Sequence, residues 1–336
     1  MNTKPMTSAP RVSAIVAVYN GAEHIASAID SLLHQTLSSF EILVVDDGSL
    51  DETEDILARY RDPRIRVLVN DTNRGIAQSR NRALREARGH YVACMDADDV
   101  SSPVRFERQV RFLDEHPDIA MVGTAAGMIS AKGDPGNSIE VPTDPDEIAR
   151  RILEVNCFVH SSVMIRRSAM LAIGGYDESL PCTIDYDLAL RVCERYKVAN
   201  LAERLVDYRI HAGQLSVARL EQQRALAREC QRRSIARRAR KASLPRDVAH
   251  AWAGERGLAS DRSRAVDDYI MWSRKFASVG DTRTALALAS QAVRARPLSP
   301  RAWSFVAGAA STRVLGRDRV RAIRWLIAKA TRSTAR

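Results

Sequence analysis

Four short apolar runs divide the first hundred residues into alternating segments. The runs cover residues 12–18, 41–45, 64–69 and 90–94, and their length and β-branched content are typical of buried strands. Between the runs, apolar residues recur at every third or fourth position, which indicates helices with one buried face. Strands that alternate with helices predict parallel pairing and right-handed crossovers. We therefore expect an α/β fold with a doubly wound sheet.

Polar residues follow the carboxyl ends of these predicted strands. In a doubly wound sheet, ligands bind in the crevice outside those strand ends. We expect side chains from four strands to converge on one such crevice. They are Asn20, Asp46, Asp47, Asn73, Arg74, Asp96 and Asp98.

The acidic run at residues 95–99 indicates a metal site at this edge of the sheet. Asp96 and Asp98 are two positions apart, so an extended backbone would turn both carboxylates to one face. Hard oxygen ligands of this kind suit Mg²⁺ or Mn²⁺, which commonly complete their coordination with substrate phosphates. An alternative interpretation is a helix cap, a role open to Asp99 or Ser101.

The glycine motifs of two common nucleotide sites do not occur after the first strand. The sequence there is Tyr-Asn-Gly-Ala-Glu, at residues 19–23, and it matches neither GxGxxG nor GxxxxGK. This disfavours NAD binding and Walker-type ATP hydrolysis. Without a backbone cradle, a diphosphate in this crevice would need a metal ion, and the acidic run offers ligands for one.

Composition adds the expected class and compartment. The chain of 336 residues is long enough for two domains, and 45% hydrophobic with 27% charged residues is typical of a globular protein. No apolar run approaches the roughly 20 residues needed to cross a bilayer. Residues 1–9 are expected to be a flexible N-terminus, because they lack the apolar centre of a secretory signal. The five scattered cysteines favour reduced thiols in a cytosolic protein and argue against a zinc site.

The charge is unevenly distributed along the chain. Residues 219–336 hold 27 Lys and Arg against 9 Asp and Glu, whereas residues 1–218 hold 24 against 32. A basic half could contact an anionic membrane, an acidic partner or nucleic acid, or it could be a solvated helical surface. Nucleic acid ranks last, because aromatic side chains are not interleaved with the basic ones. The break in charge near residue 218 is the best candidate for a domain boundary.

The basic third of the chain is predicted to be helical. Residues 216–245 resemble a long arginine-rich helix, and residues 280–303 resemble part of one tetratricopeptide repeat. Such repeats need several copies to bury a core, so a helical cap on the N-terminal domain is the favoured alternative. Residues 319–332 combine an apolar face with flanking Arg and Lys. That pattern suits either an anionic lipid surface or packing on the protein.

Seven motifs together resemble the signature of family 2 glycosyltransferases of the GT-A fold. They occur in order at residues 12–20, 44–49, 73–81, 95–99, 174–178, 185–188 and 208–211. The resemblance covers residues 10–215 and implies a GT-A-type, Rossmann-like mixed sheet there. A basic α-helical region would follow over residues 216–336.

The resemblance implies roles for the residues that would hold the nucleotide. Asp46, with Asp47 beside it, would hydrogen-bond the base, since a uracil N3–H favours an anionic acceptor. Asn20 and Arg80 would contact the nucleotide or its diphosphate. Arg82, like Arg74 before it, is open to the more common role of a solvated helix residue.

The resemblance also implies a metal site. Asp96 and Asp98 would hold a divalent cation together with the ribose and diphosphate of the donor, and His211 would complete the metal shell. The cation would act as a Lewis acid on the departing nucleoside diphosphate. For His211, a structural loop residue is the alternative.

Asp185 matches the general base of inverting members. The sequence departs from the family pattern at two neighbours, with Ile184 in place of Glu and Ala189 in place of Trp. An apolar neighbour would raise the pKa of Asp185, which suits a base, but the changes could equally reshape or weaken the acceptor site. Helix capping by Asp185 or Asp187 is the structural alternative.

The expected function is metal-dependent, inverting transfer of a sugar from a nucleotide-sugar, with UDP favoured. The acceptor would be a glycan or a lipid-linked hydroxyl in the synthesis of a surface polysaccharide or glycolipid. The enzyme would be cytoplasmic, with peripheral contact to the inner, anionic membrane face, and no nucleic acid is expected. Two alternatives remain: nucleotidyl transfer at the same type of site, and a nucleotide-sugar-binding scaffold without transferase activity.

Overall fold

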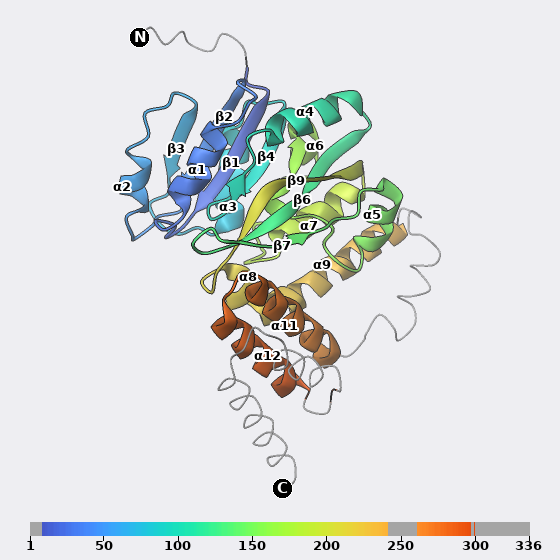
Figure 1. Cartoon of the computed structure of the whole chain (residues 1–336). Helices are drawn as coiled ribbons and strands as arrows, with labels where there is room; N and C mark the ends of the chain where they lie inside the picture. Colours follow the sequence, from blue (N-terminus) through green and yellow to red (C-terminus); the bar gives the residue numbers. More distant parts are fainter. Residues whose placement is uncertain (1–8, 241–260, 297–298, 300–336) are drawn as a thin grey trace. The chain divides into compact units, whose positions relative to one another are not determined.

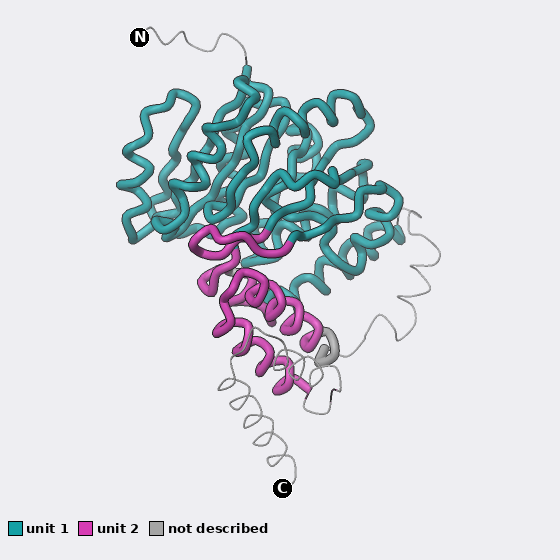
Figure 2. Tube along the Cα trace, viewed as in Figure 1, with its two compact units in different colours: residues 1–127, 138–209, 222–245 teal, residues 128–137, 210–221, 246–336 magenta. Residues whose placement is uncertain are grey.

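The computed structural model describes residues 9–240, 261–296 and 299. The chain forms two compact units, shown in teal and magenta in Figure 2. The first unit comprises residues 1–127, 138–209 and 222–245, and the second comprises residues 128–137, 210–221 and 246–336. The chain therefore passes between the two units several times, rather than once near residue 218 as the distribution of charge predicted.

Nine strands of the described chain form one mixed sheet (Figure 1). Their bounds are β1 Val12–Val18, β2 Phe40–Asp46, β3 Ile65–Val69, β4 Tyr91–Asp96, β5 Val100–Ser101, β6 Ile119–Ser130, β7 Pro135–Ile139, β8 Met164–Arg166 and β9 Lys197–Ile210. The order across the sheet is β3-β2-β1-β4-β8-β6-β9-β5, with β7 beside β6. The pairs among β1 to β4 are parallel, and β8 runs antiparallel to β4 and β6. The predicted α/β fold with a mixed, Rossmann-like sheet is confirmed.

Helices connect these strands and continue beyond them. Their bounds are α1 Ile25–Leu33, α2 Thr53–Leu57, α3 Ile76–Glu86, α4 Arg105–Glu115, α5 Pro145–Arg151, η1 His160–Ser162, α6 Arg167–Ala172, α7 Ile184–Cys193, α8 Leu215–Ala218, α9 Leu220–Arg240, α11 Asp261–Ser278 and α12 Thr282–Ala295. The four predicted strands and the helices between them agree with β1 to β4 and α1 to α3 to within a few residues. In the helices α1 and α3, the recurring apolar residues that predicted the helix also form the face that it buries.

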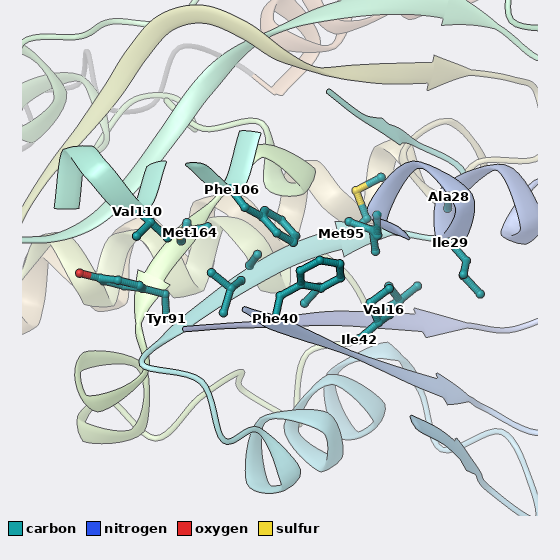
Figure 3. Close-up of a cluster of buried hydrophobic side chains, with 14 of the residues drawn as sticks. Val16, Ala28, Ile29, Phe40, Ile42, Tyr91, Met95, Phe106, Val110 and Met164 are labelled. Atoms are coloured by element: carbon teal, nitrogen blue, oxygen red, sulfur yellow. The ribbon is translucent and has the colours of Figure 1, made fainter. Parts of the chain in front are cut away.

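Alternate residues of the parallel strands build a core on one face of the sheet (Figure 3). Ile29 of α1 and Val110 of α4 pack into the same cluster. The rings of Phe40 and Phe106 meet edge to face at a centroid distance of 5.6 Å, a favoured aromatic geometry. Both rings are completely buried, which stabilises the fold by about 1.5–3 kcal/mol for each. This core fixes the register of the strands that carry the site.

The strand register brings the predicted site residues to one edge of the sheet. Val18, the last residue of β1, lies opposite Asp46 of β2, and Ala17 lies opposite Asp96 of β4. The three parallel strands therefore end together. The expectation that polar residues from their carboxyl ends share one edge is confirmed for Asp46 and Asp96.

Helix α9 uses part of its positive charge within the first unit. The Arg237 guanidinium lies 2.7 Å from Glu194, whose side chain is buried, and Arg233 lies 3.5 Å from Asp177. These ion pairs tie α9 to the rest of the first unit, and the helical cap predicted from residues 280–303 stays a prediction.

The second unit contains a helical hairpin formed by α11 and α12. Gly280 forms the turn with a φ of +80°, and the Asp281 carboxylate accepts a hydrogen bond from the Thr284 N–H at 3.0 Å to cap α12. The Ser273 hydroxyl donates to the Ala285 carbonyl at 2.7 Å and ties the two helices together. A helical hairpin is the building unit of a tetratricopeptide repeat. One hairpin does not establish a repeat, so the tetratricopeptide interpretation stays a prediction.

Two membrane-related predictions stand as follows. In the part of the chain that the structure describes, no helix has the length and apolar character that a bilayer crossing demands. The basic amphipathic segment at residues 319–332 lies outside the described residues.

Candidate active site

The loops that follow β1 and β2 are joined to each other by their polar side chains. The Asn20 amide oxygen accepts a hydrogen bond from the Leu50 N–H at 2.8 Å, and the Asn20 N–H donates to the Ser49 hydroxyl at 2.9 Å. Asn20 has a φ of +52°, in the left-handed region that asparagine tolerates better than most residues. The Ser49 hydroxyl in turn donates to the Asp46 carboxylate at 2.6 Å. The edge of the sheet therefore holds Asn20 and Asp46 in one connected network.

Asp47 is engaged by the loop that follows β3. Its carboxylate accepts hydrogen bonds from the Asn70 amide at 2.7 Å, the Arg74 N–H at 2.9 Å and the Gly75 N–H at 2.8 Å. The side chain is almost completely buried. This geometry favours a loop-holding role for Asp47, whereas its predicted contact with the nucleotide base stays a prediction.

Arg80 and Asp96 form the electrostatic centre of the site. Arg80 is buried on α3, and its guanidinium donates to the Asp96 carboxylate at the end of β4. Burial alone would raise the pKa of Asp96, but the Arg80 charge, His160 and the hydrogen bond with Ser161 together lower it, so Asp96 is ionised at neutral pH. Asp96 is thus paired with a cation that the protein itself supplies, and the predicted metal ion stays a prediction.

The remaining carboxylates of the acidic run have separate environments. Asp98 is half-buried, and its carbonyl oxygen accepts a hydrogen bond from the Arg209 side chain at 2.6 Å. Asp99 is completely buried, and its carboxylate accepts from the Arg209 N–H at 2.8 Å. Burial and the neighbouring carboxylates raise the pKa of Asp99. Asp99 therefore holds the loop to β9 and does not cap α4, whose N-cap residue is Val104.

Asp185 lies in the first turn of α7, half-buried and close enough to Arg80 and Asp96 to interact with their charges. The Asn156 amide donates to its Oδ2 atom at 2.9 Å. Burial raises the pKa of Asp185, as expected of a carboxylate beside the buried Ile184. Thr183 is the N-cap residue of α7, and the cap makes no side-chain hydrogen bond, so Asp185 and Asp187 are not its caps.

The sequence interpretation assigned no role to three groups near Arg80: the buried Tyr176 and Cys94 and the half-buried His160. The Tyr176 ring lies 5.5 Å from the Arg80 guanidinium, and its hydroxyl lies 3.3 Å from both His160 Nε2 and the Cys94 sulfur. Burial, assisted by the Arg80 charge, lowers the pKa of His160 to about 3, so the imidazole is neutral. Tyr176 lay within a recognised motif, but nothing in the local sequence distinguishes His160 from an ordinary loop histidine.

The metal prediction depends on Asp96 and Asp98. No group of three or more His, Cys, Asp or Glu side chains is arranged to hold a metal among the residues that the structure describes. A cation that also binds substrate phosphates needs only one or two carboxylates. The ionised Asp96 and the nearby Asp98 therefore fit Mg²⁺ or Mn²⁺ in that role.

His211 follows β9 and belongs to the second unit. Its backbone N–H donates to the Gln214 side-chain oxygen at 2.9 Å. Its predicted role as a metal ligand stays a prediction.

Arg74 and Arg82 line a hollow of about 540 Å³ beside α3. Arg82 donates to the Val69 carbonyl at 2.7 Å, so it also fastens α3 to the edge strand β3. Arg82 lies on α3 but is half-buried, whereas Arg74 is an exposed residue of the loop before α3, so the prediction of a helix residue is wrong for Arg74.

The sequence of the chain is similar to a known protein family and to individual relatives. The sequence profile of Glycosyl transferase family 2 matches residues 13–174. The chain is 36% identical over 211 residues to EpsE of Bacillus subtilis, which covers 61% of this chain and 74% of that protein. It is 32% identical over 205 residues to the O-antigen biosynthesis glycosyltransferase WbnJ of Escherichia coli, covering 60% and 80% of the two chains.

Solved structures share the fold at low sequence identity. TarS of S. aureus, solved in complex with UDP, is 19% identical, with a TM-score of 0.53 over 89% of this chain and 92% of that chain. The mannosyltransferase PcManGT of Pyrobaculum calidifontis, solved with GDP-Man and Mn²⁺, is 18% identical, with a TM-score of 0.52 over 97% and 87%. The sheet, the strand-end carboxylates and these relationships together show that the chain belongs to glycosyltransferase family 2 and is a glycosyltransferase.

Proposed function

We propose that this enzyme is a metal-dependent, inverting glycosyltransferase that moves a sugar from a nucleotide-sugar to a hydroxyl acceptor. One observation carries the proposal: Asp185 lies within electrostatic reach of Arg80 and Asp96, although these residues come from three separate elements. A candidate base and a candidate diphosphate site are thus adjacent. Transfer by direct displacement needs both at the same place.

The donor half of the site would consist of Asp46, Arg80, Asp96 and Asp98. Asp46 would accept the base N3–H, and Asn20 would lie against the nucleotide from the end of β1. Asp96 and Asp98 would hold Mg²⁺ or Mn²⁺, with His211 proposed as a further ligand. When bound, the ion supplies positive charge to the departing diphosphate. Arg80 keeps Asp96 ionised and so ready to bind a cation.

The acceptor half would use Asp185 as the general base. The acceptor oxygen attacks the anomeric carbon, and the bond from that carbon to the diphosphate oxygen breaks. The hydroxyl proton passes to the Asp185 carboxylate. Because attack comes from the side opposite the leaving group, the configuration inverts. The raised pKa of Asp185 supports this role, since a base is most effective when its pKa approaches the working pH.

The donor and the product are proposed by class. TarS was solved with UDP, which supports a UDP-sugar, and PcManGT was solved with Mn²⁺, which supports metal dependence. The relationship to WbnJ supports a role in the synthesis of a surface polysaccharide or glycolipid. The charge of residues 219–336 supports peripheral contact with an anionic membrane, where a lipid-linked acceptor would be located.

Nucleotide release provides the test. The full-length protein is incubated with a panel of UDP- and GDP-sugars, candidate acceptors and Mn²⁺, and free nucleoside diphosphate is measured. We expect acceptor-dependent release from at least one donor, and we expect Asp185→Asn to abolish it while calorimetry shows donor binding unchanged. Release of sugar 1-phosphate in place of nucleoside diphosphate would instead indicate nucleotidyl transfer. Donor binding with no turnover on any acceptor would count against the proposal.

A further inference from the structure

Asn156 lies directly against the proposed base. Its Nδ2 donates to Asp185 Oδ2 at 2.9 Å, across 29 residues of sequence. Both side chains are half-buried, so water competes only partly for this hydrogen bond. A donor of this kind stabilises the ionised carboxylate and restricts its rotation.

The orientation of the Asn156 amide is defined by a second hydrogen bond. Asn156 Oδ1 accepts from the Phe158 N–H at 3.2 Å, and a backbone N–H can only donate. The oxygen of the amide therefore faces Phe158, and its NH₂ group faces Asp185. Asn156 is thus a donor to the base, and a flipped amide would leave both groups mismatched.

Helix α9 holds the segment that carries Asn156. The buried Gln231 donates from Nε2 to the Glu154 carbonyl at 3.0 Å and to the Tyr186 hydroxyl at 2.9 Å. Tyr186, the residue after Asp185, donates from its hydroxyl to the Ile152 carbonyl at 2.7 Å. Gln231 therefore connects both sides of the Asn156–Asp185 pair, one through Glu154 and the other through Tyr186.

The backbone before Asp185 is strained. Thr183 has a φ of +65°, in the left-handed region that β-branched residues rarely adopt. Its hydroxyl lies 3.4 Å from the Gln223 carbonyl, also on α9. A strained conformation persists only when its surroundings hold it, and α9 supplies one of the contacts that do so.

We infer that Asn156 is a positioning residue for Asp185 and that α9, through Gln231, holds this pair in place. The inference rests on the proposed role of Asp185 as the base. Asn156 engages Oδ2 and leaves the Oδ1 atom of Asp185 as the oxygen that we propose receives the acceptor proton. Helix α9 would thus help to position the base in the transfer step, a role that its positive charge did not indicate.

Steady-state kinetics of full-length variants test the inference. For Asn156→Ala we expect kcat to fall about 10- to 100-fold, because a displaced base loses much of its effect, while the donor KM is unchanged. The pKa of Asp185 should rise once the donor is removed, so the acid limb of the kcat–pH profile should move to higher pH. Arg80 and Asp96, the charged groups that face Asp185, are the same in both proteins. Gln231→Leu should change kcat in the same direction by a smaller factor.

Matched variants separate positioning from a general effect on folding. Asn156→Asp keeps the shape of the side chain but replaces the donor by a carboxylate, so it should shift the acid limb further than Asn156→Ala. Asn137→Ala and Gln222→Leu change exposed residues of the same types, the second of them also on α9, and should behave as wild type. Thermal midpoints and calorimetric donor binding are measured for every variant.

The outcomes distinguish this inference from the proposed function. If Asp185→Asn abolishes transfer while both Asn156 variants keep the wild-type kcat and acid limb, the positioning role is wrong and the base assignment stands. If Asp185→Asn transfers sugar normally, the base assignment and the inference both fail. Loss of kcat with a shifted acid limb and intact donor binding supports the inference.

Discussion

Arg80 holds the ionised carboxylate of Asp96 through a buried ion pair between helix α3 and strand β4. The Arg80 side chain is buried, whereas the Asp96 carboxylate is partly exposed at the edge of the sheet. Removing one member of such a pair leaves a buried charge uncompensated, which costs far more than losing a surface ion pair. Removing Arg80 should therefore lower both the free energy of unfolding and the affinity for the donor.

Replacing Arg80 tests this dependence. We expect Arg80→Met to lower the free energy of unfolding by about 3 kcal/mol, measured by urea denaturation, and to weaken donor binding. Arg85→Met, an exposed arginine on the same helix, should change stability by less than about 0.5 kcal/mol. Equal stability of the two variants would show that the pair makes no net contribution.

The metal assignment predicts a loss of turnover without a loss of fold. Asp98→Ala should reduce donor turnover about 1000-fold, the effect of removing several kcal/mol of charge stabilisation from the leaving group. Its thermal midpoint without ligand should match that of wild type, but UDP with Mn²⁺ should no longer raise it. EDTA should produce the same loss in the wild-type enzyme, and added Mn²⁺ should reverse it. The exposed Asp55→Ala serves as the control. Full activity after both treatments would contradict the assignment.

The hydrogen bonds of Asp47 predict a structural defect. Asp47→Ala would leave the Asn70 amide and the Arg74 and Gly75 N–H groups without their acceptor. We expect a loss of about 2–3 kcal/mol in the free energy of unfolding and a raised donor KM, because the loop after β3 loosens. A variant as stable as wild type but unable to bind donor would instead favour a direct contact with the base.

The raised pKa of Asp185 predicts two effects of pH. Transfer requires the ionised base, so turnover should fall as pH decreases, with a midpoint above the ordinary pKa of an aspartate. The fold disfavours the ionised form, so Asp185→Asn should stabilise the protein at pH 7 by about 1 kcal/mol. This gain should vanish as pH falls below about 3.9, where Asp185 is protonated in the folded and unfolded states alike. Denaturation curves at several pH values check this; a gain that does not change with pH would contradict it.

The parallel half of the sheet was predictable because its strands are short segments dominated by apolar and β-branched residues. The run at residues 12–18 gave β1 with the same bounds, since a strand buried on both faces needs no alternation to be recognised. The antiparallel strands were harder to predict. β6 contains glycine, alanine and threonine, and β9 alternates only in part between buried and exposed residues, so neither has a strong local signal.

The site was predictable as a set of residues but not as a set of roles. Asp47 looked equivalent to Asp46, and the difference arises from partners far away in sequence, whereas Asp99 was expected to hold the loop, although its partner was not predicted. Asp47 binds the loop 23 to 28 residues further on, and Asp99 binds Arg209, 110 residues away. Asn156 and His160 were missed for the same reason, because only the fold brings them to Asp185 and Tyr176.

The contacts of Gln231 bear on the modularity of this enzyme. A segment beyond residue 220 supports a pair of residues on the acceptor side, so the family-matched segment is not a self-contained catalytic module. A chimera that exchanges C-terminal regions between family members would inherit the donor site intact but acquire a foreign support for its base. Such exchanges should therefore alter turnover and acceptor choice more than donor affinity, and α9 would have to be transferred together with residues 152–158 for the two to remain matched.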